Sequence, residues 1–123
     1  MNDPRELMYT KDHEWIYYDG EDAYVGISDF AQQELGDLVF VNLPEVDDEV
    51  IAGESFGDVE SVKAVSDVLS PVTGIVLEVN EEILEDASLI NQDAFSAWFI
   101  KVGNITETED LLTAEEYDRI IEG

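Results

Sequence analysis

At 123 residues the chain has room for one hydrophobic core, which excludes two large domains and predicts a single domain over residues 1–123. Its 31 acidic and five basic residues give a formal net charge of -26, which disfavours nucleic acid and anionic membranes as partners because both repel it. The absence of cysteine excludes disulfides, thiol nucleophiles and cysteine-ligated metals.

The excess of acidic residues also bears on the ionic strength in which the protein works. At molar ionic strength the Debye length shrinks to about 3 Å, so dense carboxylates repel one another much less. We therefore expect a salt-adapted, halophilic protein, and the alternative is an acidic docking surface for basic partners. Residues 1–10 show no signal or transit pattern and no apolar run is long enough to cross a membrane, so a cytoplasmic location is expected.

The first elements in chain order are a hairpin and a short helix. Residues 15–18 are rich in strand formers, an Asp-Gly pair supplies a turn, and residues 23–27 return antiparallel. Ser28 is a candidate N-cap for a short helix that ends at Gly36.

From residue 38 onward the pattern predicts short strands separated by turns. Residues 38–43 read as a mostly buried strand. Short strands at this spacing indicate antiparallel sheets rather than βαβ units. We therefore expect a mainly β fold, a flattened antiparallel β-barrel or sandwich with short helices and a C-terminal helix. The further predicted elements are strands at 49–51, 55–60, 64–69, 74–79 and 98–102, and one helical turn at 81–84.

The end of the chain carries a helix signal. Thr113 and Glu116 have the spacing of a capping box, which predicts a helix at about 114–122. Its apolar residues, among them Tyr117, are expected to dock on the barrel.

Common catalytic and metal-binding motifs are missing. His13 is the one histidine, and no GxSxG, P-loop, GxGxxG or HExxH pattern is present. Paired carboxylates are expected by chance among 31 acids, and no calcium-loop pattern occurs, so we expect no metal site. The sequence thus favours a non-catalytic protein.

Lys63 stands out because it lies between two predicted strands in a chain that has few lysines. A hairpin tip would expose its amine while the strands on either side hold it in place, which suits a tethered group. On position alone, an ordinary surface lysine is the alternative.

The segment around Lys63 resembles the lipoyl-attachment region of glycine cleavage H proteins. Val62 and Ala64 flank the lysine, where biotin carriers typically have methionines. The resemblance extends over nearly the whole chain, and the matching segments are 9–15, 25–28, 36–41, 43–44, 50–54, 59–68, 70–80, 98–101 and 114–117.

This resemblance implies the barrel-sandwich fold of the lipoyl and biotinyl carriers, with a carrier core at about 23–103. It also implies that Lys63 carries lipoate in amide linkage and that the protein is a shuttle. The implied partners are glycine decarboxylase (a pyridoxal-phosphate protein), a tetrahydrofolate-dependent aminomethyltransferase that receives the aminomethyl group, dihydrolipoyl dehydrogenase and a lipoate-attaching enzyme.

Two carboxylates match family positions that contact the loaded arm, namely Glu14 and Asp67, and surface carboxylates of no special role are the alternative. The turn at Asp47-Asp48 departs from the family, which has glycine there, so Asp must tolerate that backbone or the turn must differ. Two other functions stay open: a lipoyl carrier or relay for another pathway, and an unmodified acidic binding module.

Overall fold

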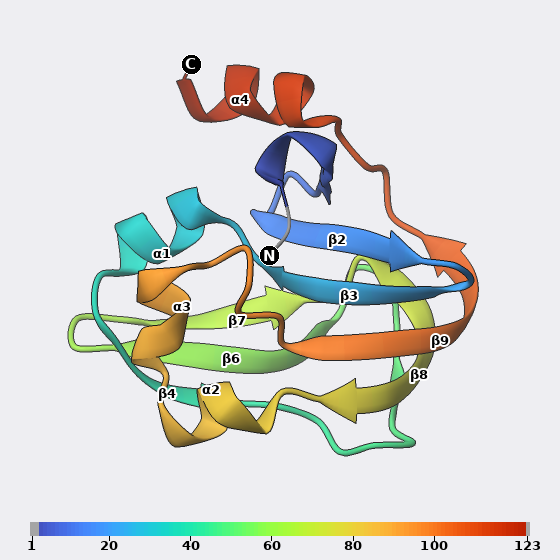
Figure 1. Cartoon of the computed structure of the whole chain (residues 1–123), viewed down its shortest axis with the longest axis horizontal. Helices are drawn as coiled ribbons and strands as arrows, with labels where there is room; N and C mark the ends of the chain where they lie inside the picture. The colour runs from blue at the N-terminus through green and yellow to red at the C-terminus, as the bar shows by residue number, and fades with distance from the viewer. Residues whose placement is uncertain (1–2, 123) are drawn as a thin grey trace.

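The computed structural model describes residues 3–122, which form two antiparallel sheets with short helices at their edges (Figure 1). The larger sheet has the strand order β1-β2-β3-β9-β8-β5, and the smaller one has the order β4-β6-β7. The elements are η1 (Pro4–Glu6), β1 (Met8–Tyr9), β2 (Glu14–Asp19), β3 (Asp22–Ile27), α1 (Asp29–Leu35), β4 (Leu38–Asn42), β5 (Glu49–Val50), β6 (Ser55–Ser61), β7 (Val65–Leu69), β8 (Val72–Val79), α2 (Glu81–Glu85), α3 (Ser88–Gln92), β9 (Ile100–Thr108) and α4 (Ala114–Glu122).

The two sheets pack face to face around one main core. Val25 and Val76 of the larger sheet are fully buried in the same cluster as Val41 and Val59 of the smaller sheet. Their alternation with outward residues gives each strand one inner face, as expected for a sandwich. The predicted mainly β, flattened antiparallel sandwich is therefore confirmed.

The predicted hairpin and first helix are also confirmed. β2 pairs antiparallel with β3, from Glu14 opposite Ile27 to Asp19 opposite Asp22. Ser28 caps α1, since the backbone amide of Ala31 donates to its Oγ at 3.1 Å.

The prediction of a mostly buried strand at 38–43 is wrong for two consecutive residues. Val39 is 58% exposed and Phe40 is 51% exposed. A β-bulge lies between Leu38 and Phe40 in the pairing with β6, so strict alternation of inner and outer residues is broken there. An apolar run alone gives no sign of such a bulge.

The final strand is longer than the predicted 98–102. β9 starts at Ile100 and continues to Thr108, because its polar second half pairs with the start of β8 at Val72 and Thr73. This half is mostly exposed, so it lacks the apolar alternation that signals a strand.

The C-terminal helix is present as predicted, but it docks mainly on η1 and the edge strand β1, whereas docking on the barrel as a whole was expected. The amide of Glu116 donates to Thr113 Oγ1, and the amide of Thr113 donates back to the Glu116 carboxylate, which is the capping box. Tyr117 is buried and its ring stacks on that of Tyr9 at 4.5 Å between centroids. Trp15 belongs to the same small cluster.

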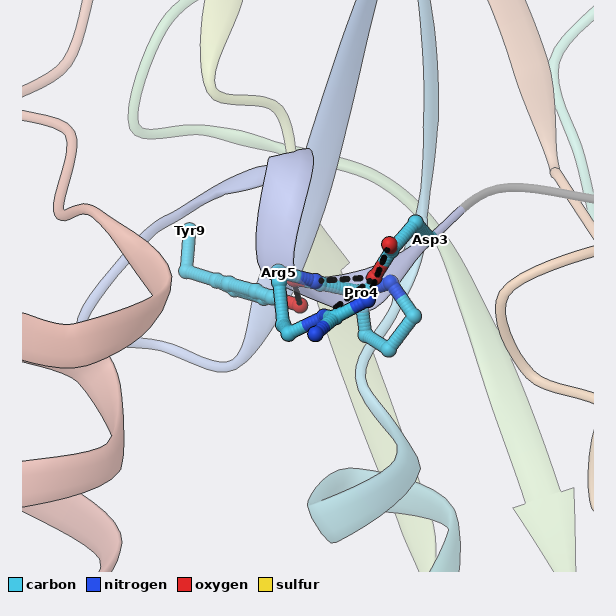
Figure 2. Close-up of polar contacts among 4 residues, drawn as sticks. All are labelled: Asp3, Pro4, Arg5 and Tyr9. Atoms are coloured by element: carbon cyan, nitrogen blue, oxygen red, sulfur yellow. Dashed lines mark hydrogen bonds and ion pairs between the residues drawn. The ribbon is translucent and has the colours of Figure 1, made fainter.

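The N-terminal turn, η1, is linked to this cluster through Tyr9 (Figure 2). The Tyr9 hydroxyl donates to the carbonyl oxygen of Pro4 at 2.6 Å. Arg5 folds back on Asp3, with 2.9 Å between Nη2 and Oδ2. One of the five basic side chains is therefore engaged within this first turn.

Candidate functional site

Lys63 lies at the tip of the β6–β7 hairpin, and its side chain is exposed. Ser61 organises the tip: its backbone amide donates to the Ala64 carbonyl at 2.8 Å, and its Oγ accepts from the amide of Ala64 at 3.1 Å and from that of Lys63 at 3.3 Å. The hydroxyl thus satisfies two backbone amides of the turn, which keeps the position of Lys63 well defined.

The stem of Lys63 runs toward the end of α1. A Cβ atom built on Gly36 would lie 3.7 Å from Lys63 Cε, so the two segments are in contact. Figure 1 shows the hairpin tip projecting on the same side of the molecule as α1. Gly36 ends that helix with a positive φ of 82°, a conformation that glycine adopts without strain.

The Lys63 amine has no acidic partner within residues 3–122. The ion pairs found there use the side chains of Arg5, Lys101 and Arg119. An exposed primary amine on an ordered turn is sterically open to acylation and loses no ion pair when its charge is removed. The tip therefore fits a covalent attachment site.

Glu14 lies at the start of β2 and is buried, with 3% of the residue exposed. Its carboxylate accepts a hydrogen bond from Thr10 Oγ1 at 2.6 Å. Burial raises the pKa of this carboxyl to about 7, while the bond from Thr10 and a backbone bond from Leu69 lower it in part. Glu14 is thus no ordinary surface carboxylate.

A cavity of about 180 Å³ adjoins Glu14. Its lining comes from the β1–β2 turn and the start of β2, the turn after β5, the end of β7, and the segment that leads into α4 together with that helix, and Lys63 and Asp67 are not among these residues. The lining residues are Thr10, Lys11, Asp12, Glu14, Gly53, Leu69, Ser70, Glu109, Asp110, Leu112 and Ile120.

Asp67 is exposed in the middle of β7, where it pairs with Asp58 of β6. Its neighbour Val68 is buried, so alternation directs Asp67 to the outer face of the small sheet. The three predicted residues are not one cluster. They are instead spread along the length of β7: Lys63 lies before its start, Asp67 lies within it, and Glu14 lies beside its end at Leu69.

Three contributors were missed at the level of sequence. Ser61 carries the hydrogen bonds of the tip, Thr10 holds the Glu14 carboxylate, and Gly36 contacts the lysine stem. A serine two residues before a turn lysine is a signal for a side-chain-to-backbone turn. Thr10 lies only four residues before Glu14, but nothing in the sequence indicates that the two side chains meet, and nothing local to Gly36 indicates a contact with the distant Lys63.

The part of the chain that the structure describes shows neither a cluster of metal ligands nor a membrane-spanning helix. Residues 3–122 contain no group of three or more histidine, cysteine or acidic side chains arranged to hold a metal ion. None of their helices is long and apolar enough to cross a membrane.

The comparisons with known proteins agree with this geometry. A family model described as glycine cleavage H-protein matches residues 7–123. The chain belongs to the glycine cleavage H-protein family. The resemblance predicted from the attachment segment is thereby confirmed.

Relatives within this family match over nearly their full length. The glycine cleavage system H protein of Halothermothrix orenii is 56% identical over 99% of this chain and 98% of its own. That of Lachnoclostridium phytofermentans is 56% identical over 94% of this chain and 91% of its own. The crystal structure of the H protein from Mycobacterium marinum superposes with a TM-score of 0.91 at 42% identity and covers 98% of this chain and 99% of that one.

Proposed function

We propose that this chain is the lipoyl carrier of a glycine cleavage system and carries lipoate in amide linkage to Lys63. The observation that carries the proposal is the exposed, unpaired Lys63 amine at a hairpin tip ordered by Ser61, in a chain of this family. When attached, lipoate would supply a redox-active disulfide that could accept the aminomethyl group of glycine and be reduced in doing so. The protein itself is then a non-catalytic component.

The chain's own contribution is to place and orient the arm. The hairpin tip projects beyond the strands (Figure 1), and the lysine stem contacts Gly36 at the end of α1. A tether of this kind gives the cargo a high effective concentration at each enzyme that it visits.

Glu14 and Asp67 are proposed as acidic contacts for the amine of the cargo. Asp67 lies four residues after Lys63, which separates the two by at most roughly 13 Å at about 3.3 Å per extended residue. Glu14 offers a buried carboxylate whose pKa of about 7 lets a neighbouring ammonium group draw it into the ionised form. A charge pair formed in such a dry setting is stronger than one in water.

The partners proposed for this carrier are glycine decarboxylase, the tetrahydrofolate-dependent aminomethyltransferase, dihydrolipoyl dehydrogenase and the enzyme that attaches lipoate. Residues 23–103 are proposed as the carrier core of a single domain, with α4 as an appended helix. The cytoplasm is the proposed location.

Reconstitution with glycine decarboxylase tests the proposal. The lipoylated protein is expected to support exchange of the glycine carboxyl carbon with bicarbonate, and the Lys63→Arg variant is expected to support none, because arginine keeps the charge but accepts no acyl group. Lys101→Arg is the matched control and is expected to behave like the unaltered protein. Absence of lipoate-dependent exchange would contradict a glycine cleavage role and favour another lipoate pathway.

A further inference from the structure

The cavity beside Glu14 is closed in part by the end of the chain. Leu69, at the end of β7, lines it from the small sheet, whereas Leu112 lies in the segment that leads into α4 and Ile120 lies in that helix. Ile120 is 47% exposed, so it lies at the rim of the cavity. Figure 1 shows α4 as an outer layer on the N-terminal segment, away from the small sheet. One wall of the cavity is therefore a helix that belongs to neither sheet.

Tyr117 is the main anchor of this helix. It is the one buried residue among residues 114–122 of α4, and its ring stacks on that of Tyr9. Its hydroxyl oxygen lies 2.8 Å from Nδ1 of His13 and 2.7 Å from Oγ of Ser28. Just before the helix, the backbones of Leu112 and Tyr9 exchange hydrogen bonds of 2.7 and 2.9 Å. Release of α4 thus breaks the contacts of one side chain and leaves both sheets paired.

Electrostatic repulsion opposes the docking of α4. Its one basic residue, Arg119, pairs within the helix with Glu115 at 2.7 Å, and no ion pair joins α4 to the rest of residues 3–122. The cavity lining adds the carboxylates of Asp12, Glu109 and Asp110 against one cation, Lys11. Like charges on the helix and on the cavity lining weaken the docked state, most of all at low salt. The acidic residues of α4 are Glu115, Glu116, Asp118 and Glu122.

Resting on the proposed function, we propose that α4 is a lid over the cavity beside Glu14 and that Tyr117 is the positioning residue that holds the lid closed. With α4 docked, the helix separates cargo in the cavity from bulk water. With α4 released, Ile120 leaves the rim and the cavity opens to solvent and to a partner enzyme. A segment held by so few buried contacts opens locally at a lower free energy than the core does.

A cysteine placed in the cavity of the unmodified full-length chain tests the lid, because the chain has no cysteine of its own. Leu69→Cys puts a thiol on the cavity lining. Val68→Cys is the matched control, since Val68 is the preceding residue of the same strand and is buried in the main core at 2% exposure. The probe is a maleimide that carries an uncharged dye too large for the closed cavity, and intact mass reports the labelling rate in dilute urea.

Labelling of Leu69→Cys is expected to vary little with urea, because release of one helix exposes little surface, whereas labelling of Val68→Cys is expected to rise steeply with urea. Addition of Tyr117→Phe is expected to raise the Leu69→Cys rate about fivefold or more. Tyr9→Phe keeps both hydrogen bonds of the Tyr117 hydroxyl and is expected to raise it by no more than about twofold. Molar KCl is expected to slow labelling of Leu69→Cys by screening the repulsion.

Two results would overturn the lid. An equal urea dependence at the two cysteines would show that the cavity opens only when the whole chain unfolds. A Leu69→Cys rate that Tyr117→Phe leaves unchanged would show that the cavity is open while α4 is docked. These measurements use the chain without lipoate, so they do not depend on Lys63. If the labelling behaves as expected but Lys63 takes no lipoate, the carrier function fails and the gated cavity stands.

Discussion

Nδ1 of His13, in the turn before β2, lies 2.8 Å from the hydroxyl oxygen of Tyr117 in α4. The same hydroxyl lies 2.7 Å from Oγ of Ser28, the residue that caps α1. One side chain of the last helix therefore joins the start of the large sheet to the start of the first helix. This contact links the docking of α4 to the segment that holds Glu14.

Replacing Tyr117 by Phe is expected to lower the free energy of unfolding by about 1–2 kcal/mol, because it removes both hydrogen bonds and keeps the ring that stacks on Tyr9. Denaturant unfolding of the variant and the unaltered chain measures this loss of free energy. Tyr9→Phe is the matched control, since it removes one hydroxyl from the same aromatic stack and breaks only the bond to Pro4. A loss for Tyr117→Phe no larger than that for the control would contradict a joining role.

Glu14 makes stability depend on pH. Its pKa is about 7 in the fold against a reference value of 4.5, so between these pH values the folded state binds more protons than the unfolded chain does. The contribution of this carboxyl is full below pH 4.5 and is lost as pH rises through 7, by up to about 3 kcal/mol. The difference in unfolding free energy between the unaltered chain and Glu14→Gln, measured in molar KCl, is expected to change over this window. A difference that stays constant from pH 4 to about pH 8 would count against the buried carboxyl.

The structure shows which of the two alternatives holds for the Asp47-Asp48 turn, where the family has glycine. Its φ is 79°, and its amide donates to the Val76 carbonyl at 2.8 Å, so the backbone keeps the left-handed conformation and Asp tolerates it. Asp47→Ala is expected to cost about 1 kcal/mol, and Asp47→Gly to gain about 0.5 kcal/mol. Asp47→Asn separates charge from conformation. Equal stability of the Ala and Gly variants would show that this conformation carries no strain.

Salt is expected to stabilise the fold. Within residues 3–122 only three acidic side chains are in ion pairs, so most of the 31 carboxylates repel one another without a nearby cation. The melting temperature in molar KCl is expected to exceed that in dilute buffer by about 5 °C or more. An uncharged osmolyte at equal osmolality is the control. Equal melting temperatures in the two buffers would exclude salt adaptation.

Elements with local signals were predictable. The β2–β3 hairpin, the Ser28 cap and the capping box before α4 each depend on residues that are neighbours in sequence. α3 was missed because its N-cap, Ala87, makes no side-chain bond, and β1 was missed because it is only two residues long. The antiparallel pairing of β2 with β3 followed from the pattern, whereas the bulge in β4 did not.

Some features of the candidate site were likewise predictable from local sequence, and others were not. The position of Lys63 at a hairpin tip was predictable because its motif is local and its hairpin is short. The burial of Glu14 was not, since Thr10 and the distant strand end at Leu69 enclose it only in the fold. Asp67 was predicted to be a surface carboxylate or an arm contact, and its exposure is compatible with both.

The most direct test of the central claim is peptide mass spectrometry of the protein purified from its native host. We expect the peptide containing Lys63 to carry lipoate in amide linkage and the peptides with Lys11 or Lys101 to be unmodified. An unmodified Lys63 in cells whose other lipoyl proteins are lipoylated would contradict the carrier function and point to an acidic binding module.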